Sequence, residues 1–520
     1  MAVGERSESQ SRHPTPTTQR LSTGIAGLDD ILGGGLPPDR LYLIQGDPGT
    51  GKTTLALQFL LEGLKRGEKV LFITLSETQD ELAAVARSHG WDLDGVHVFE
   101  LSAAQQNRSA EQNTLFHPSE VELNEVTQVL LDEVERLSPS RVVLDSLSEL
   151  RLLAQNALRF RRQILALKQH FVGKKSTVML LDDRNSGTGG LEAQAHTVAH
   201  GVMELEQVAP EYGAERRRLR IAKLRGVSFR GGYHDLQIVH GGLQVFPRLV
   251  AHEHRNGFVR NLVSSGVPEL DALVGGGIAR GTSMLIMGPA GSGKSTLSMQ
   301  YVCAAMERGE HAAMFLFDEG LETMLARADG VGIDLRRWID NGALTPRQID
   351  PAEMPPGAFV AHVREAVEQQ GAKLVVIDSL NGYMNAMPEE RYLTLHMHEL
   401  LSYLGQRGVM TILVMAQHGL MGRMESQVDI SYLSDSVLLL RYFEAKGHIR
   451  LALSVVKKRT GPHERTIREM MITPNEGIRV GSPLVEFQGI LTGVPTFVGS
   501  DGKAMSLLKP HGGSGGQGVP

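Results

Sequence analysis

Short apolar runs rich in β-branched residues alternate with longer amphipathic stretches along most of the chain. The runs of the first half lie at 41–45, 69–75, 141–145 and 177–183. Those of the second half follow in the same order at 282–288, 312–319, 373–378 and 410–417. A further β-rich, hairpin-like stretch comes late in each half, at 217–226 and 448–461. This alternation predicts an α/β fold in which helices connect the strands of a mostly parallel sheet.

The pattern of the first half recurs in the second half at a constant offset. Ser22-Thr23-Gly24 is answered by Ser264-Ser265-Gly266, 242 residues further on (264 − 22). A repeat of this length predicts two domains, each large enough to bury its own core. The expected divisions are a polar, disordered N-terminus at 1–19, a first domain at 20–248, a linker at 249–260, a second domain at 261–488 and a flexible tail at 489–520.

Composition narrows the functional classes. The chain has 53 Lys and Arg against 59 Asp and Glu, and this net charge of −6 speaks against a protein that coats nucleic acid. The one cysteine, Cys303, excludes a disulfide framework and a cysteine-built zinc site, and it fits a reducing cytoplasm. No apolar run reaches ~18 residues, and no apolar signal core opens the chain. We therefore expect a cytoplasmic protein without a membrane span.

Each half carries one glycine-rich segment of the form G-x-x-x-x-G-K-[ST] between a predicted strand and a predicted helix. Glycines let the N–H groups of such a loop point at phosphate oxygens, and the helix adds the positive end of its dipole. The expected ATP-binding residues are Gly46, Asp47, Pro48, Gly49, Thr50, Gly51, Lys52, Thr53 and Thr54 in the first half, and Gly288, Pro289, Ala290, Gly291, Ser292, Gly293, Lys294, Ser295 and Thr296 in the second. Two such loops predict a tandem ATPase.

An apolar run that ends in aspartate follows each loop, at Asp145 in the first half and at Asp378 in the second. A carboxylate at the C-terminal end of a parallel strand, near a phosphate loop, can hold a magnesium-bound water. The loop hydroxyl is the usual protein ligand of the same ion. We therefore predict one Mg²⁺ site from Thr53 with Asp145, and a second from Ser295 with Asp378.

These residues together resemble the KaiC family, the double-domain members of the RecA-like ATPases. The resemblance runs from about Leu21 to Phe487, and it includes carboxylates after the second strand of each half, a K-x-R pair late in each half, and the segment DISYLSD at 429–435. It implies two tandem RecA-like P-loop NTPase domains. It also implies a hexameric double ring that holds ATP between neighbouring subunits.

The resemblance further implies which carboxylates act on the γ-phosphate. The family has two adjacent glutamates after the second strand, and a carboxylate there can orient a water or deprotonate a hydroxyl. Glu77 matches in the first half, where Ser76 replaces the first glutamate, and Asp318 and Glu319 match in the second half. We expect Glu77, Asp318 and Glu319 to be catalytic, with slow hydrolysis in the first half.

The two K-x-R pairs are the expected contribution of a neighbouring subunit. They are Lys223-Leu224-Arg225 and Lys457-Lys458-Arg459. Residues two apart on a strand lie on one face, so both cations of a pair can point at one γ-phosphate. Supplied by a neighbour, they would stabilise the charge of the transition state as an arginine finger does.

The segment at 429–435 contains the expected phosphoacceptor. In the family, an adjacent Ser-Thr pair is phosphorylated by ATP bound at the subunit interface. Ser431 aligns with the serine, and Tyr432 takes the place of the threonine. A site shaped for a threonine oxygen would misplace a phenolic oxygen, and a displacement of ~1 Å can cost about 100-fold in rate. We therefore expect one acceptor, Ser431, with Asp318 or Glu319 as its base.

The sequence thus predicts a KaiC-like signalling protein that uses Mg-ATP, hydrolyses it and phosphorylates itself, with serine/threonine-type kinase activity. Unidentified signalling proteins are its expected partners, and nucleic acid is not expected. Two alternatives stay open. One is a DNA-dependent RecA-like motor, in which the K-x-R strands would be basic DNA contacts. The other is a nucleotide-gated ring scaffold with little turnover, which Ser76 makes conceivable.

Overall fold

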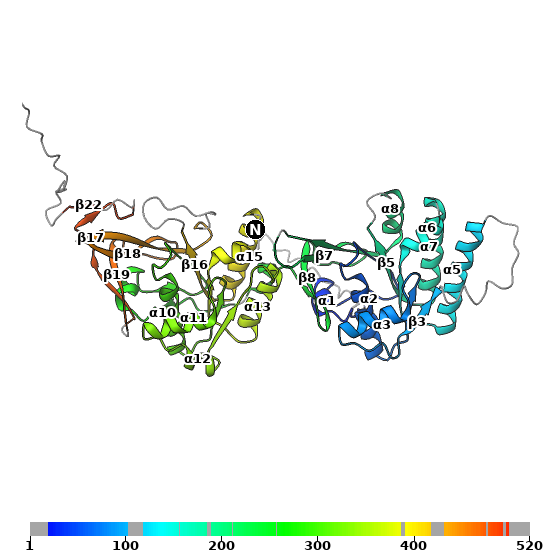
Figure 1. Cartoon of the computed structure of the whole chain (residues 1–520), viewed down its shortest axis with the longest axis horizontal. Helices are drawn as coiled ribbons and strands as arrows, with labels where there is room; N and C mark the ends of the chain where they lie inside the picture. Colours follow the sequence, from blue (N-terminus) through cyan, green and yellow to red (C-terminus); the bar gives the residue numbers. More distant parts are fainter. Residues whose placement is uncertain are drawn as a thin grey trace, which may run out of the picture. The chain divides into compact units, whose positions relative to one another are not determined.

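The computed structural model divides the chain into two compact units, with the boundary in the sequence between Arg248 and Leu249 (Figure 1). The structure describes residues 19–101, 118–154, 156–184, 189–210, 212–255, 257–385, 390–417, 431–474, 477–491 and 496–498. The expected disorder of 1–19 therefore falls outside the described residues except at Gln19. Most of the expected tail falls outside them as well.

The first unit contains a nine-stranded sheet with helices on both faces. Its helices are α1 (Ala26–Ile31), α2 (Lys52–Lys65), α3 (Gln79–Ser88), α5 (Pro118–Leu137), α6 (Leu147–Ala154), α7 (Ala157–Gly173) and α8 (Gly189–Val198). Its strands are β1 (Leu41–Gly46), β2 (Val70–Thr74), β3 (His97–Glu100), β4 (Arg141–Asp145), β5 (Thr177–Asp183), β6 (Gly201–Val208), β7 (Arg216–Leu224), β8 (Tyr233–Val239) and β9 (Gly242–Phe246). All four runs of the first half form strands.

The order of strands in this sheet is β3-β2-β4-β5-β1-β6-β7-β8-β9. Pairing is parallel from β3 to β6 and antiparallel from β6 to β9. In the central strand β1, Tyr42 and Ile44 pack in the core under α1, α2 and α3, whereas Leu41 and Leu43 pack in the core under α5, α6 and α7. Burial on both faces explains why the central runs are continuously apolar.

The second unit repeats this architecture. Its helices are η1 (Ala251–His254), α9 (Pro268–Leu273), α10 (Lys294–Glu307), α11 (Leu321–Gly330), α12 (Arg336–Asp340), α13 (Pro356–Glu368), α14 (Leu380–Asn385) and α15 (Glu390–Gln406). Its large sheet has the strands β12 (Ser283–Gly288), β13 (Ala312–Leu316), β14 (Leu344–Gln348), β15 (Leu374–Asp378), β16 (Met410–Ala416), β17 (Ser436–Ala445), β18 (His448–Lys458), β19 (Ile467–Thr473) and β20 (Gly477–Pro483). Two short pairs, β10 (Leu262–Val263) with β11 (Ile278–Ala279) and β21 (Phe487–Gln488) with β22 (Thr496–Phe497), complete it.

The large sheet of the second unit has the order β14-β13-β15-β16-β12-β17-β18-β19-β20, which matches the first unit strand for strand. The tandem α/β fold with mostly parallel sheets is therefore confirmed. The late β-rich stretches belong to a longer antiparallel extension of each sheet than their hairpin-like pattern suggested. Among the described residues, no helix combines the length and the apolar character needed to cross a membrane.

The segment expected to be a linker packs against the second unit. Leu249 and Ala251 are buried in the core that α13, α14 and α15 share. The backbone N–H of Ala251 donates to the carboxylate of Glu399 on α15 at 3.0 Å. The start of the expected tail also packs, because Ile490 is buried beside Phe443.

Candidate functional site

Both glycine-rich loops connect the central strand of a sheet to the next helix, β1 to α2 and β12 to α10. The glycines before these helices, Gly51 and Gly293, have positive φ angles of 99° and 78°. A Cβ on Gly51 would lie 3.2 Å from Leu243, and one on Gly293 would lie 2.3 Å from Ile472. Glycine therefore serves both the left-handed turn and the close packing. The N–H groups of each following helix are left to face an anion at the loop.

The loop lysines are both buried, but their environments differ. Lys52 Nζ donates to the carbonyls of Gly46 at 2.8 Å and Asp47 at 3.0 Å, and it forms an ion pair with Asp183 Oδ1 at 2.8 Å. Lys294 Nζ donates to the carbonyl of Pro289 at 2.7 Å, and burial lowers its pKa. The first loop thus has a carboxylate beside its lysine.

Asp183 is a site residue that sequence reasoning missed. It ends β5 and lies opposite Gly46 in the parallel register with β1. In the second unit, Ala416 lies opposite Gly288, so the carboxylate has no counterpart at this position. The sequence feature that could have indicated this residue is the Asp-Asp pair that ends the apolar run at 177–183. The sequence does not say that this run pairs with β1, and the sheet order decides it.

The predicted magnesium ligands come together in both units. The Thr53 hydroxyl donates to Asp145 Oδ2 at 3.2 Å. In the second unit, the Ser295 side chain is close enough to Asp378 to oppose the effect of burial on the pKa of that carboxyl. Burial, with the charge of Glu77, raises the pKa of Asp145 to about 6, and burial also raises the pKa of Asp378. Asp378 Oδ2 is buried and has no hydrogen-bond partner within the described part of the chain. A hydroxyl beside a desolvated carboxylate fits a hard divalent cation such as Mg²⁺.

Glu77 follows β2 and is held through its backbone. Its N–H donates to Thr74 Oγ1 at 2.9 Å, and its carbonyl accepts from the same hydroxyl at 2.7 Å. Its Oε2 is buried without a hydrogen-bond partner among the described residues. Burial raises the pKa of Glu77, and the charges of Glu81 and Asp183 raise it further. The neighbouring Ser76 is exposed. Glu77 therefore has the desolvated environment that strengthens a carboxylate as a base.

The second-unit carboxylates are engaged by other side chains. Glu319 pairs with Arg327 on α11 at 2.6 Å, and Asp318 accepts a hydrogen bond from the Ser379 hydroxyl. The repeat offset of 242 residues puts Val85 of α3 at the position of Arg327 (327 − 242). Burial still raises the pKa of Glu319, but Arg327 opposes that shift. An arginine beside Glu319 favours its ionised form and weakens it as a base relative to Glu77.

The K-x-R pairs hold the segment that leads into β6 or β17, which is the end of α8 in the first unit and a turn in the second. Lys457 Nζ donates to the carbonyls of Ser431 and Ser434, both at 2.7 Å, and Arg459 Nη2 donates to that of Tyr432 at 2.6 Å. Ser431 is partly buried at the start of this turn. Residues 429 and 430 of the expected segment lie outside the described residues.

The first unit repeats this arrangement. Lys223 Nζ donates to the carbonyl of His196 at 2.5 Å, and Arg225 Nη2 donates to that of Thr197 at 2.9 Å. Val202 pairs with Lys223 as Val437 pairs with Lys457. His196 and Thr197 are therefore the structural counterparts of Ser431 and Tyr432. Sequence reasoning missed this equivalence because the two segments share no residue type.

A third cation joins the first-unit pair. Burial and the charge of Arg225 lower the pKa of Lys168 on α7. Burial, Arg225 and Lys168 together lower the pKa of Lys223. Lys168 Nζ donates to the carbonyl of Val198 at 2.9 Å. Mutual repulsion of these cations would be relieved by an anion brought against them.

His200 lies near these three cations and forms a hydrogen bond with the central strand β1. Its Nδ1 accepts from the backbone N–H of Leu41 at 3.1 Å. Burial lowers the pKa of His200 to about 4, and the charges of Lys168, Arg40, Arg225 and Lys223 add to the effect. The neutral imidazole is thus the form that the fold requires.

The first unit should lose stability in mild acid because of His200. Its folded-state pKa of about 4 is below the ordinary 6.5, so the unfolded chain binds more protons between these values. The free energy of unfolding therefore falls as the pH falls through that range. In His200→Asn, the amide oxygen can still accept a hydrogen bond from the backbone N–H of Leu41. We expect the free energy of unfolding of this variant, measured in urea, to fall less between pH 7 and pH 5 than that of the parent chain. Exposed His240→Asn is the control, and an unchanged pH dependence in His200→Asn would contradict the assignment.

Comparison with known proteins agrees with this geometry. The family model described as "ATPase: KaiC" matches residues 21–250 and again residues 263–485. The chain is 27% identical over 498 residues to circadian clock protein KaiC3 of Synechocystis sp., with 93% of this chain and 96% of the relative covered. It is 28% identical over 520 residues to circadian clock oscillator protein KaiC of Parathermosynechococcus lividus, with 95% and 93% covered. A KaiC of Prochlorococcus marinus is 28% identical over 495 residues, with 94% and 97% covered. The chain belongs to the KaiC family of ATPases, and the family model covers each of its two units once.

Proposed function

We propose that this KaiC-family ATPase hydrolyses Mg-ATP in both units and phosphorylates Ser431 with ATP bound in its second unit. Neighbouring subunits of a hexameric double ring would complete each site. The observation that carries the proposal is the attachment of the Ser431 turn to the K-x-R pair, through the carbonyls of Ser431 and Tyr432. Any movement of Lys457 or Arg459 toward a γ-phosphate would therefore move Ser431 with it.

In the first unit, Glu77 acts as the general base. Its carboxylate takes a proton from a water molecule, and the oxygen of that water bonds to the γ-phosphorus. The bond between this phosphorus and the β-γ bridging oxygen breaks, and ADP leaves. Thr53 and Asp145 would hold Mg²⁺, which when bound neutralises charge on the phosphate oxygens. Arg225 and Lys223 of a neighbouring subunit stabilise the charge that develops in the transition state.

In the second unit, the Ser431 hydroxyl takes the place of water. Its oxygen bonds to the γ-phosphorus, the bond to the leaving ADP breaks, and the hydroxyl proton passes to Asp318 or Glu319. Arg327 keeps Glu319 ionised at the expense of its strength as a base. Phosphoryl transfer is therefore expected to be slower than hydrolysis at Glu77.

Incubation of the full chain with Mg-ATP, followed by mass spectrometry of the 425–436 peptide, tests the kinase proposal. We expect one phosphate in this peptide, lost in Ser431→Ala and retained in Tyr432→Phe, because the tyrosine oxygen extends too far from its backbone to replace a threonine oxygen. Hydrolysis read from the same samples separates kinase from ATPase. Absence of phosphate from the peptide would reject autophosphorylation at this segment while leaving the ATPase intact.

A DNA-dependent motor is less well supported. The basic residues of β7 form ion pairs within the sheet, Arg218 with Glu206 at 2.8 Å and Arg220 with Glu204 at 2.6 Å. The charge of these arginines is therefore largely neutralised by glutamates of the same sheet, which leaves little of it to attract a nucleic acid. The relatives are named for the circadian clock, and we propose that signalling proteins likewise respond to the ATP state of this ring. Substantial turnover in the assay above would reject a scaffold that only binds nucleotide.

A further inference from the structure

A cavity of about 660 Å³ lies in the second unit, away from its glycine-rich loop. Its wall combines the segment before β10, the turn between β11 and β12, the end of α15, and the residues beside β17 and β18. The lining includes Arg255, Phe258, Arg260, Arg280, Gln406 and Thr460, together with Asp435. The volume is within the range of about 300–1,000 Å³ typical of small-molecule sites.

Three buried polar atoms of this wall lack a hydrogen-bond partner within the described residues. They are Arg280 Nη1, Gln406 Oε1 and Thr460 Oγ1. Arg280 also pairs with Glu310 through Nη2, which fixes the guanidinium and leaves Nη1 unmatched. Leaving a buried polar group without a hydrogen-bond partner is unfavourable, because its hydration is lost and nothing replaces it. Three such groups on one wall indicate a polar ligand that supplies both donors and acceptors.

The mouth of the cavity is built from the segment that joins the repeats. Phe258 packs over Gly281 and Gly408, where an added Cβ would come within 2.4 Å and 2.6 Å of its ring. The backbone N–H of Arg280 donates to the carbonyl of Asn261 at 2.9 Å. These contacts hold the segment against the unit, and Arg255 and Arg260 lie exposed at the edge of the cavity.

We propose that this cavity binds a small phosphate ester that also carries hydroxyl groups. Three guanidinium groups suit a phosphate, because arginine pairs with phosphate oxygens in a planar, bidentate manner. Gln406 Oε1 accepts a hydrogen bond from a ligand hydroxyl, and the Thr460 hydroxyl can donate or accept. The single carboxylate on the wall, Asp435, is already engaged by the N–H and hydroxyl of Ser283 at 2.9 and 3.1 Å.

The position of the cavity connects it to the catalytic apparatus. Asp435 Oδ1 lies 3.6 Å from Arg459 Nη1, and Thr460 directly follows Arg459. Arg459 in turn holds the Ser431 turn through Tyr432. A ligand against Asp435 and Thr460 would therefore alter how Arg459 is held, and with it the second ATP site.

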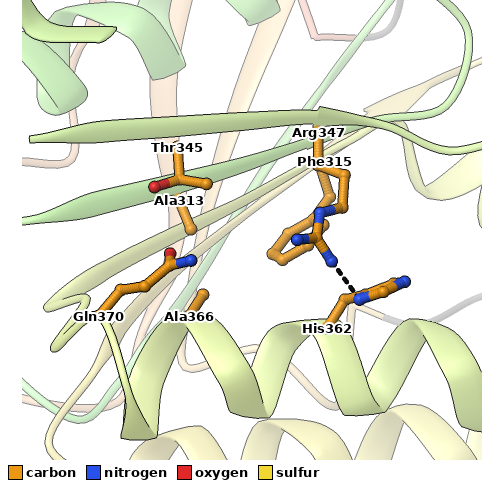
Figure 2. A pocket seen from close by; sticks show the side chains of 7 residues that line it. All are labelled: Ala313, Phe315, Thr345, Arg347, His362, Ala366 and Gln370. Carbon is orange, nitrogen blue, oxygen red and sulfur yellow. Dashed lines mark hydrogen bonds between the residues drawn. The ribbon is translucent and has the colours of Figure 1, made fainter. Parts of the chain in front are cut away.

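A smaller hollow between β13, β14 and α13 shares only one of these features, the buried Gln370 Oε1 that has no hydrogen-bond partner within the described residues. Figure 2 shows the Arg347 side chain directed at His362 across its end. Arg347 also pairs with Glu365 at 3.3 Å. The cation of that hollow is thus matched by a carboxylate, and much of the remaining wall is alkyl or aromatic, from Ala313, Phe315 and Ala366.

Calorimetric titration of ribose 5-phosphate into the full chain tests the proposal, with both loops first saturated with Mg-ADP so that they do not compete. We expect saturable binding of one molecule per chain, absent with ribose, and weakened at least 10-fold in Arg255→Ala/Arg260→Ala. Gln406→Glu should weaken binding similarly because it sets a negative charge against the phosphate. Exposed Arg336→Ala is the matched control and should bind as the parent chain does.

Variants are compared only where thermal unfolding matches the parent chain, and having two independent changes guards against a misfolded one. No saturable binding, or equal affinity in the parent, double-arginine and Gln406→Glu chains, would overturn the proposal. The ATP turnover of the second unit, measured with Lys52→Ala in the first loop, should change at least twofold on addition of ribose 5-phosphate. That readout does not depend on whether Ser431 is phosphorylated.

Discussion

Glu77→Gln should lower ATP turnover in the first unit by at least about 100-fold, which is the usual contribution of a general base. The measurement is made in a chain whose second loop carries Lys294→Ala, so that the remaining hydrolysis comes from the first unit. Glutamine keeps the size of the side chain and its backbone contacts with Thr74, but it cannot take a proton. Binding of Mg-ATP should change little, because Glu77 is not a loop residue.

The matched control is Asp80→Asn, an exposed carboxylate on the first turn of α3. It should leave turnover within about twofold of the parent chain, as surface substitutions usually do. If Glu77→Gln hydrolysed ATP at the parent rate, the base would have to be another group. Asp183, whose carboxylate pairs with Lys52, would then be the next residue to substitute.

Arg225→Ala should also abolish most ATP hydrolysis in the first unit. Mixing this variant with Lys52→Ala chains should restore the hydrolysis. Loss of a cation aimed at transition-state charge costs about 100-fold or more. If the arginine acts on the neighbouring subunit, Arg225→Ala chains still have an intact loop and Lys52→Ala chains still have an intact arginine. If the chain forms the proposed ring, assemblies made from equal amounts of the two variants should regain active interfaces at about a quarter of all positions. Both chains carry Lys294→Ala, and steady-state ATPase is the readout.

The control mixes Arg225→Ala with Arg225→Ala/Lys52→Ala, in which no intact arginine is available. That mixture should stay inactive. An arginine that acted within its own subunit would give no recovery in the first mixture either, and this result would contradict a shared site. A second control, Arg217→Ala, removes a cation that instead donates to the carbonyl of Gly49 in its own loop at 3.2 Å, so its effect should not be rescued by mixing.

Much of the candidate site could be predicted because its parts are local in sequence. A glycine-rich loop, its lysine and its hydroxyl lie within eight consecutive residues, and an aspartate that ends an apolar strand points to one end of the sheet. Thr53 and Asp145 accordingly lie within hydrogen-bond distance, although 92 residues separate them. The repeat strengthened these predictions, because each motif in one half could be compared with its copy in the other half.

Residues that act through a neighbouring strand or helix could not be predicted in this way. Asp183 is beside the first loop because β5 pairs with β1. Arg327 neutralises Glu319 because α11 packs so that the two side chains lie within 2.6 Å. Neither contact corresponds to a motif with a characteristic spacing, so the pattern of residue types does not predict it.

The sequence by itself determined the tandem α/β fold, the two nucleotide loops and the aspartates beside them, since these follow from apolar periodicity and from motifs that a single loop can supply. The tertiary structure decided how the two units differ. It put an acidic cluster at Glu77, Asp145 and Asp183, an arginine against Glu319, and an arginine-lined cavity next to Arg459. These differences arise from long-range strand order and helix packing, which set the desolvation and the charge around each group.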